Sequence, residues 1–134
     1  MLLHGSCRCQ AVKFEITGPI HRFTNCHCPD CRKINGAAFS SNLVVAAAGF
    51  KITAGEEMLA DYESSPGKFR RFCQTCGAHV YAHINSRPEI VIVRAGLLDD
   101  EPGVRPQNHI WVSHKAPWFE ITDSLPQFPE AFKG

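Results

Sequence analysis

The chain has 134 residues, a hydrophobic fraction of 44% and a formal net charge of +1, which suits one domain with a modest core over residues 1–134. A charge this close to neutral gives no reason to expect nucleic acid as a partner, and no apolar stretch is long enough to cross a bilayer. The N-terminus lacks the basic start and apolar run of a signal peptide, so we expect a cytoplasmic protein.

In the first third of the chain, one strand and one short helix are predicted. Apolar side chains alternate with charged ones over residues 12–16, which predicts a half-buried strand that ends at Gly18. A helix of one or two turns is predicted after Cys28, because Pro29 suits a first helical position and Gly36 could end the helix.

The rest of the chain is predicted to form short strands. Residues 43–48 are apolar, and the β-branched pair inside this range favours a strand. Further strands are predicted over residues 50–53, 68–72, 80–84, 90–94 and 109–112. The last dozen residues, which include Pro126 and Pro129, are expected to form an extended tail packed on the surface. The periodicity therefore predicts a small, mainly antiparallel β domain with little helix.

Seven cysteines in three tight groups are the main chemical feature of the sequence. The groups are Cys7 and Cys9, then Cys26, Cys28 and Cys31, and finally Cys73 and Cys76. Two thiolates at such spacings can bind one small tetrahedral cation, with each sulfur about 2.3 Å from it. A closed zinc site takes four ligands, so the cysteines divide most simply into one site of four and one of three. The odd count and a reducing cytosol disfavour disulfides.

Spacing alone leaves the division of the cysteines open. Cys7 and Cys9 could join Cys73 and Cys76 in a closed four-sulfur site, which leaves three cysteines with an open position typical of catalytic zinc. Cys28 and Cys31 could instead combine with Cys73 and Cys76. A protein side chain could also close the second site and make it purely structural; the candidates are His27, Asp30, His109 and His114.

A metal held by Cys26, Cys28 and Cys31 would have a distinctive chemistry. Three thiolates donate strongly, so the metal is a weaker Lewis acid than one held by three histidines, and it should ionise bound water poorly. A soft ligand such as a substrate thiolate suits this centre better. The ligand set therefore favours handling of a thiol over hydrolysis.

The order of these motifs resembles that of a known family. The matching residues are Gly5-x-Cys7-x-Cys9, Cys26-His27-Cys28-x-x-Cys31-Arg32-Lys33, Gly36-Ala37-x-Phe39, Tyr62-x-Ser64, Phe72-Cys73-x-x-Cys76-Gly77, His109-Ile110-Trp111 and Trp118. On these residues the chain resembles the glutathione-dependent formaldehyde-activating enzyme family, also called the Gfa or CENP-V family. The resemblance spans nearly the whole chain and implies an Mss4-like (β-tent) fold, with antiparallel sheets and zinc clips at the turns.

The resemblance also implies a division of the cysteines and an activity. It implies a structural zinc at one set, Cys7, Cys9, Cys73 and Cys76, and a catalytic zinc at the other, Cys26, Cys28 and Cys31, so that two Zn²⁺ ions bind per chain. It implies a carbon–sulfur lyase that acts on a small thiol such as glutathione and an aldehyde such as formaldehyde. Such an enzyme forms or cleaves an S-hydroxymethyl adduct, with no nucleic acid or membrane as partner.

Other residues beside the cysteines are candidates for roles in this reaction. His27 is the histidine nearest to the three-cysteine group in the sequence and is our candidate general acid. Arg32 and Lys33 could bind the carboxylates of the thiol, as could Arg70 and Arg71, and Trp111 could wall the pocket; these roles are hypotheses. The alternative function is a zinc-stabilised, non-catalytic binding or thiol-sensing domain. The sequence does not indicate an oligomeric state.

Overall fold

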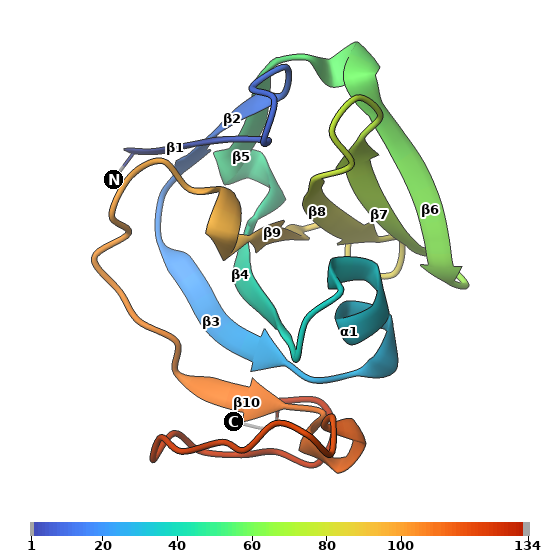
Figure 1. Cartoon of the computed structure of the whole chain (residues 1–134). Coiled ribbons are helices and arrows are strands. Elements are labelled where there is room, and N and C mark those ends of the chain that lie inside the picture. The colour runs from blue at the N-terminus through green and yellow to red at the C-terminus, as the bar shows by residue number, and fades with distance from the viewer. Residues whose placement is uncertain (1, 133–134) are drawn as a thin grey trace.

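Two β-sheets of unequal size form most of the fold in the computed structural model, which describes residues 2–132 (Figure 1). The smaller sheet has the order β1-β2-β5, made of β1 (Leu2–Ser6), β2 (Lys13–Thr17) and β5 (Phe50–Ala54). The larger sheet has the order β10-β3-β4-β9-β8-β7-β6. Its strands are β3 (Ile20–Cys26), β4 (Ser40–Ala46), β6 (Leu59–Ser65), β7 (Lys68–Cys73), β8 (His79–Ile84), β9 (Ile90–Arg94) and β10 (Asn108–Ile110).

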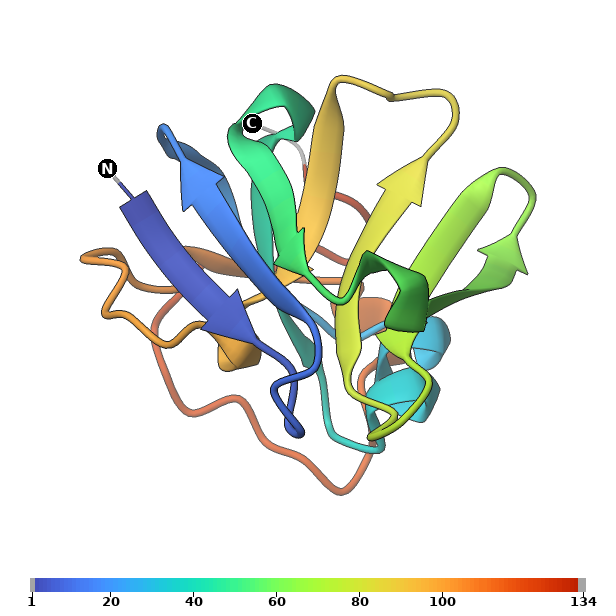
Figure 2. The same ribbon diagram turned by 90° about the horizontal axis from the view of Figure 1, so that it is seen from above.

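The hydrophobic core lies between the two sheets, which fan apart when the molecule is seen from above (Figure 2). Phe14 and Ile16 of β2 are buried on one side, and Leu43 of β4 and Val93 of β9 are buried on the other. Alternation of buried and exposed residues along β2 is what the sequence predicts for a half-buried strand. The mainly β fold is therefore confirmed.

The sheets are mainly antiparallel, as predicted, with one parallel pair formed by β10 and β3. One predicted strand is shorter in the structure. The strand predicted over residues 109–112 ends at Ile110, because Trp111 adopts a left-handed conformation with φ 57°. The chain then turns through a short 3₁₀ helix, η4 (Val112–His114). Three more such turns are η1 (Ala47–Gly49), η2 (Glu56–Met58) and η3 (Ala95–Leu97).

The one α-helix of the described residues, α1 (Pro29–Asn35), starts and stops where the sequence predicts. The Sγ atom of Cys28 caps its N-terminus by accepting a hydrogen bond from the Cys31 amide, and Pro29 occupies the first turn. Gly36 ends the helix in a left-handed conformation. None of the helices within residues 2–132 is long and apolar enough to span a membrane.

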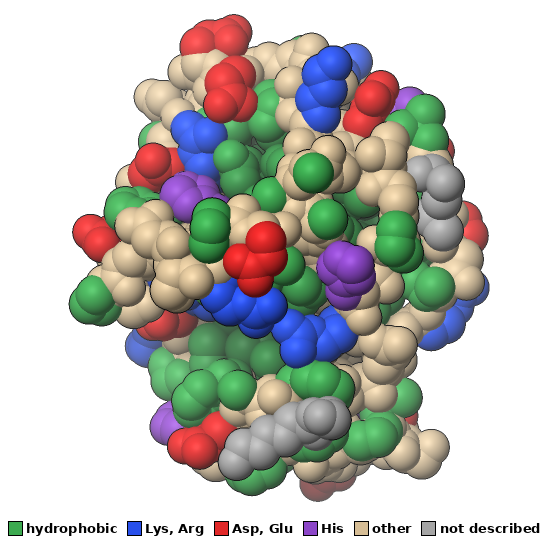
Figure 3. All heavy atoms as spheres, turned by 180° about the vertical axis from the view of Figure 1, so that it is seen from behind, with side chains coloured by type: hydrophobic (Ala, Val, Ile, Leu, Met, Phe, Trp, Pro, Cys, Tyr) green, Lys and Arg blue, Asp and Glu red, His purple; other side chains and the backbone are tan. Residues whose placement is uncertain are grey.

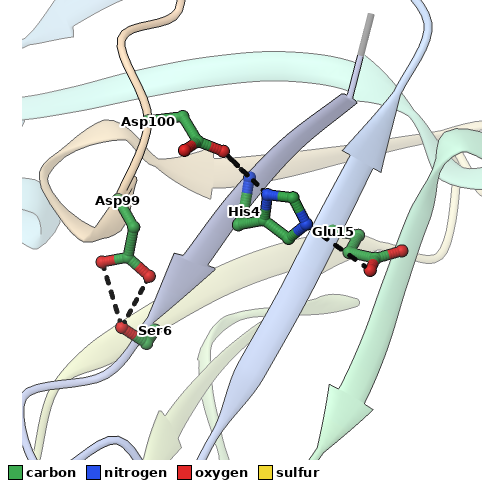
Figure 4. Close-up of polar contacts among 5 residues, drawn as sticks. All are labelled: His4, Ser6, Glu15, Asp99 and Asp100. Carbon is green, nitrogen blue, oxygen red and sulfur yellow. Dashed lines mark hydrogen bonds and ion pairs between the residues drawn. The ribbon is translucent and has the colours of Figure 1, made fainter.

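The segment after η3 is tied back to β1, as Figure 4 shows. Ser6 Oγ donates a hydrogen bond to Asp99 Oδ2 at 2.9 Å, and the amide of His4 donates to Asp100 Oδ2 at 2.7 Å. The Asp99 amide in turn donates to the carbonyl of His4. These contacts hold β1, the edge strand of the smaller sheet, against the segment that follows η3. Beyond them, the C-terminal tail runs extended, and its Gln127 bridges to His109 of β10; its last two residues lie outside the described range.

Glycine is required at position 5 because the backbone there passes close to the ring of Phe14. Gly5 lies opposite Phe14 in the β1–β2 pairing, and a Cβ atom at this position would collide with the Phe14 ring. Gly5→Ala is therefore expected to lower the free energy of unfolding by about 1–3 kcal/mol through overpacking, measured by urea denaturation. Gly96→Ala is the matched control, because a Cβ atom there meets nothing within 4 Å. Equal stability of the two variants would contradict this explanation.

Candidate metal centres and cavity

Four cysteines from two distant turns meet at one point. Cys7 and Cys9 lie in the turn between β1 and β2, whereas Cys73 ends β7 and Cys76 lies in the turn before β8. Figures 1 and 2 show these two turns side by side. The Sγ atoms of all four lie within 4.8 Å of one another. The four cysteines therefore place a turn of the smaller sheet next to a turn of the larger sheet.

The sulfur spacing of this group fits a small tetrahedral ion. The Sγ atoms of Cys7 and Cys9 are 3.6 Å apart, and those of Cys9 and Cys73 are 3.8 Å apart. Four sulfurs placed about 2.3 Å from a central zinc would be about 3.8 Å from one another. The Val12 amide donates a hydrogen bond to Cys7 Sγ at 3.3 Å, which helps to hold this sulfur in place. The group could therefore hold a metal ion.

Cys7 and Cys9 lie in a tight turn and not in a strand. The turn follows the end of β1; within it the Gln10 amide donates a hydrogen bond to the carbonyl of Cys7, and Gln10 has a φ of 66°. The turn, rather than strand periodicity, brings the two sulfurs together.

The second group consists of the remaining three cysteines. Cys26 ends β3, Cys28 caps α1 and Cys31 lies within the helix, and their Sγ atoms also lie within 4.8 Å of one another. All seven cysteines are free of disulfides. Among residues 2–132, no histidine or carboxylate joins either group. The structure thus brings together the two sets that the family resemblance implies and keeps Cys28 and Cys31 apart from Cys73 and Cys76.

A cavity of about 240 Å³ opens beside the three-cysteine group. Its wall includes all three cysteines together with Thr24, Asn42, Ile92 and Trp111. Four cationic side chains also line it, namely Arg22, Lys68, Arg87 and Arg94, and no carboxylate of the described residues does. Lys and Arg side chains gather near the middle of the face shown in Figure 3. The cavity is suited to an anionic ligand.

Two arginines beside this cavity are buried without an acidic partner. Arg94 is 5% exposed; its Nε donates to His79 Nδ1 at 3.0 Å, its Nη1 donates to Asn42 Oδ1, and its Nη2 has no partner in the described chain. Arg70 is 2% exposed, and its Nη1 donates to Cys31 Sγ at 3.8 Å. Contacts with Cys26 and Cys28, followed by the two arginine charges, hold the pKa of the Cys31 thiol well below its usual range.

The predicted substrate-binding residues are not all at the cavity. Trp111 lines it, whereas Arg32 and Lys33 on α1 do not. The Nε atom of Arg32 is buried without a hydrogen-bond partner, and Lys33 is exposed. The cations that line the cavity come from β3, β7, β9 and the turn before β9. Sequence reasoning missed all four of them, because only the pairing of the strands brings them to the cysteines.

His27 lies in a buried chain of polar contacts and not among the lining residues of the cavity. It is 0% exposed, its Nε2 lies 2.8 Å from His109 Nδ1, and His109 Nε2 lies 3.0 Å from Asp123 Oδ2. Its ring also packs on that of Phe39, with 5.0 Å between the ring centroids. Burial, followed by the neighbouring His109, lowers the pKa of His27 to about 4. His27 is therefore a neutral, buried imidazole.

Comparison with known proteins gives one family. Residues 2–114, which include all seven cysteines, match the family described as glutathione-dependent formaldehyde-activating enzyme. A Halomonas elongata protein named "Putative glutathione-dependent formaldehyde-activating enzyme" is 31% identical over 129 residues, which cover 90% of this chain and 82% of that protein. A Pyrenophora teres f. teres protein of the same name is 31% identical over 80 residues, covering 58% of this chain and 42% of that protein. A crystal structure of a Rhodobacter sphaeroides protein superposes with a TM-score of 0.62 at 25% identity, covering 77% of this chain and 91% of that one.

Proposed function

Because the chain belongs to the glutathione-dependent formaldehyde-activating enzyme family, we propose that it is a carbon–sulfur lyase acting on a small thiol and an aldehyde. The observation that carries the proposal is the group of three cysteines, Cys26, Cys28 and Cys31, at the wall of a cavity lined with cations. Glutathione and formaldehyde are the substrates that the family description suggests. The other four cysteines would hold a structural metal.

The proposed reaction joins the thiol to the aldehyde without any redox change. The sulfur of the thiol attacks the carbonyl carbon, so a C–S bond forms and the carbonyl π electrons move to oxygen. The resulting alkoxide takes up one proton, equivalent to the proton that the thiol loses, and the product is an S-hydroxymethyl thioether. The reverse reaction breaks the same C–S bond.

Different residues of the chain would have different roles in this reaction. A zinc ion held by Cys26, Cys28 and Cys31 would lower the pKa of a thiol that binds beside it. An all-sulfur ligand set is what zinc accepts in proteins, so the residues fit the ion. Arg22 at the cavity wall could bind a carboxylate of the thiol, and Trp111 could cover its apolar part. Arg32 and Lys33 remain candidates for the same contact only if the thiol extends beyond the cavity.

Two side chains could supply the proton to the alkoxide. His27 is the candidate from the sequence, but its imidazole is neutral and contacts His109 rather than the cavity. Lys68 lines the cavity itself, and burial followed by the charge of Arg70 lowers the pKa of its ammonium group. General acids of this kind typically contribute about 100-fold or more to a rate.

Substitution of His27 and of Lys68 shows which of these side chains donates the proton. Lys68→Met and Lys68→Arg are both expected to slow adduct formation about 100-fold, because an arginine keeps the charge but does not release its proton. His27→Gln is expected to retain most of the activity. The rates are measured by NMR from the exchange between free and thiol-bound formaldehyde. Full activity in Lys68→Arg, with loss in His27→Gln, would assign the proton to His27.

Cobalt substitution tests the proposal directly. Both sites are loaded with Co²⁺, and glutathione is added while the thiolate-to-cobalt charge-transfer band is recorded. The band is expected to grow to saturation, because a three-cysteine centre has one position left for a thiolate. S-methylglutathione, which has no free thiol, is the matched control and should leave the band unchanged. An unchanged band at millimolar glutathione would identify a closed site and a zinc-stabilised binding domain.

A further inference from the structure

The charges buried around the three-cysteine group do not balance. Arg70 and Arg94 together carry two positive charges, and both guanidinium groups are at least nine-tenths buried. Among residues 2–132, no carboxylate pairs with either of them: their partners are Ser64 and Cys31 for Arg70, and His79 and Asn42 for Arg94. A buried charge is costly unless an opposite charge is near. The opposite charge must come from the cysteines or from a ligand.

The neighbours of Arg94 cannot supply that negative charge. Burial, followed by the charge of Arg94, lowers the pKa of His79 to about 3, so this histidine is neutral and accepts the hydrogen bond from Arg94 Nε. The Oδ1 atom of Asn42 accepts from both Arg94 and Ser40. The guanidinium is thus held in place by uncharged groups, and its free Nη2 belongs to a side chain that lines the cavity.

The three-cysteine centre and the two arginines together carry a net positive charge when a divalent ion is bound. Three thiolates around a divalent ion carry one net negative charge, and the two buried arginines carry two positive charges. One positive charge is left over, before Lys68 is considered. A neutral ligand in the fourth position leaves this excess in a medium of low dielectric constant, whereas a single anion removes it. Lys68, Arg22 and Arg87 at the cavity wall add further positive charge. A bound anion therefore lowers the excess, whereas a neutral ligand leaves all of it in place.

We propose that Arg70 and Arg94 make the three-cysteine centre selective for an anionic fourth ligand over a neutral one. The inference rests on the proposed function for its metal and for the open position, and it adds the reason why a thiolate is bound in preference to water or the aldehyde. The two arginines act as positioning and charge-balancing residues. Arg71, the next residue on β7, is different: its charge is paired with Asp61 and Glu56, and its hydrogen bonds go to these two residues and Tyr81 rather than to a cysteine.

The test uses two simple probes on the cobalt-loaded protein. Azide is the anionic probe and imidazole is the neutral one, and each is titrated while the cobalt absorption is recorded. Arg94→Gln is expected to weaken azide binding at least about tenfold relative to imidazole binding. Arg70→Gln should act in the same direction, and Arg94→Lys should restore most of the preference because it keeps the charge. Arg71→Gln is the matched control and should leave the ratio of the two affinities unchanged.

Each outcome decides the inference. An unchanged ratio in Arg94→Gln and Arg70→Gln, or an equal change in Arg71→Gln, would overturn it. The same holds if neither probe binds to the unmodified protein. In another outcome, azide binding depends on the arginines while glutathione leaves the cobalt spectrum unchanged. That result would support selection by charge and contradict the proposed thiol chemistry. Loss of glutathione binding and failure of charge selection are therefore read from separate titrations.

Discussion

Replacement of Cys73 by serine is expected to remove most of the stability of the fold. Cys73 is fully buried at the end of β7, 64 positions from Cys9 in the sequence, and its Sγ lies 3.8 Å from that of Cys9. Structural zinc is worth about 10–16 kcal/mol in small domains, which is comparable to the entire 5–15 kcal/mol of a typical domain. The proposed metal link between the β1–β2 turn of the smaller sheet and the β7–β8 turn of the larger sheet would be lost. Urea denaturation followed by circular dichroism, with bound zinc counted in parallel, measures the loss.

Cys28→Ser is the control for this experiment. Cys28 is half-buried and caps α1, and serine is among the preferred residues at the N-cap of a helix. We therefore expect Cys28→Ser to fold with one tightly bound zinc ion and a denaturation midpoint close to that of the unmodified protein. A Cys73→Ser protein with an unchanged midpoint would show that the four-cysteine group does not stabilise the fold.

The sequence predicts those elements whose signals are local. Alternation along residues 12–16 marks β2, and Pro29 with Gly36 marks the helix. Two strands of the larger sheet were missed for different reasons. β3 ends in four consecutive buried residues and so lacks a period of two, and β6 is a largely polar edge strand. In both, pairing with neighbours decides the conformation.

The same contrast between local and distant signals applies to the site. Cysteine spacing identifies the candidate ligands, because cysteines only two or three positions apart in the sequence are also close in space. The buried arginines could not be assigned in this way. Arg94 ends β9, and it reaches the cavity because the β4–β9 register sets it opposite Asn42. His79 joins it from β8, which lies beside β9. Such contacts depend on tertiary pairing, which leaves no pattern in a single sequence.

Cys28→Ser is also expected to abolish the proposed reaction while leaving the fold intact. Loss of one of three thiolates weakens metal binding at the cavity, and a Lewis-acidic metal is worth several kcal/mol to such a step. A rate of adduct formation at least about 100-fold lower follows, since each 1.36 kcal/mol is a factor of ten. The rate is measured by exchange NMR with glutathione and formaldehyde, and the spontaneous reaction is subtracted from a mixture without protein.

Together, the two cysteine variants separate stability from chemistry. If the four-cysteine group is structural and the three-cysteine group catalytic, Cys73→Ser loses the fold, whereas Cys28→Ser keeps the fold and loses the reaction. Undiminished catalysis by a folded Cys28→Ser protein would place the chemistry away from the three-cysteine group. The serine hydroxyl replaces the sulfur as the acceptor for the Cys31 amide, so this variant loses only a metal ligand and keeps the helix cap.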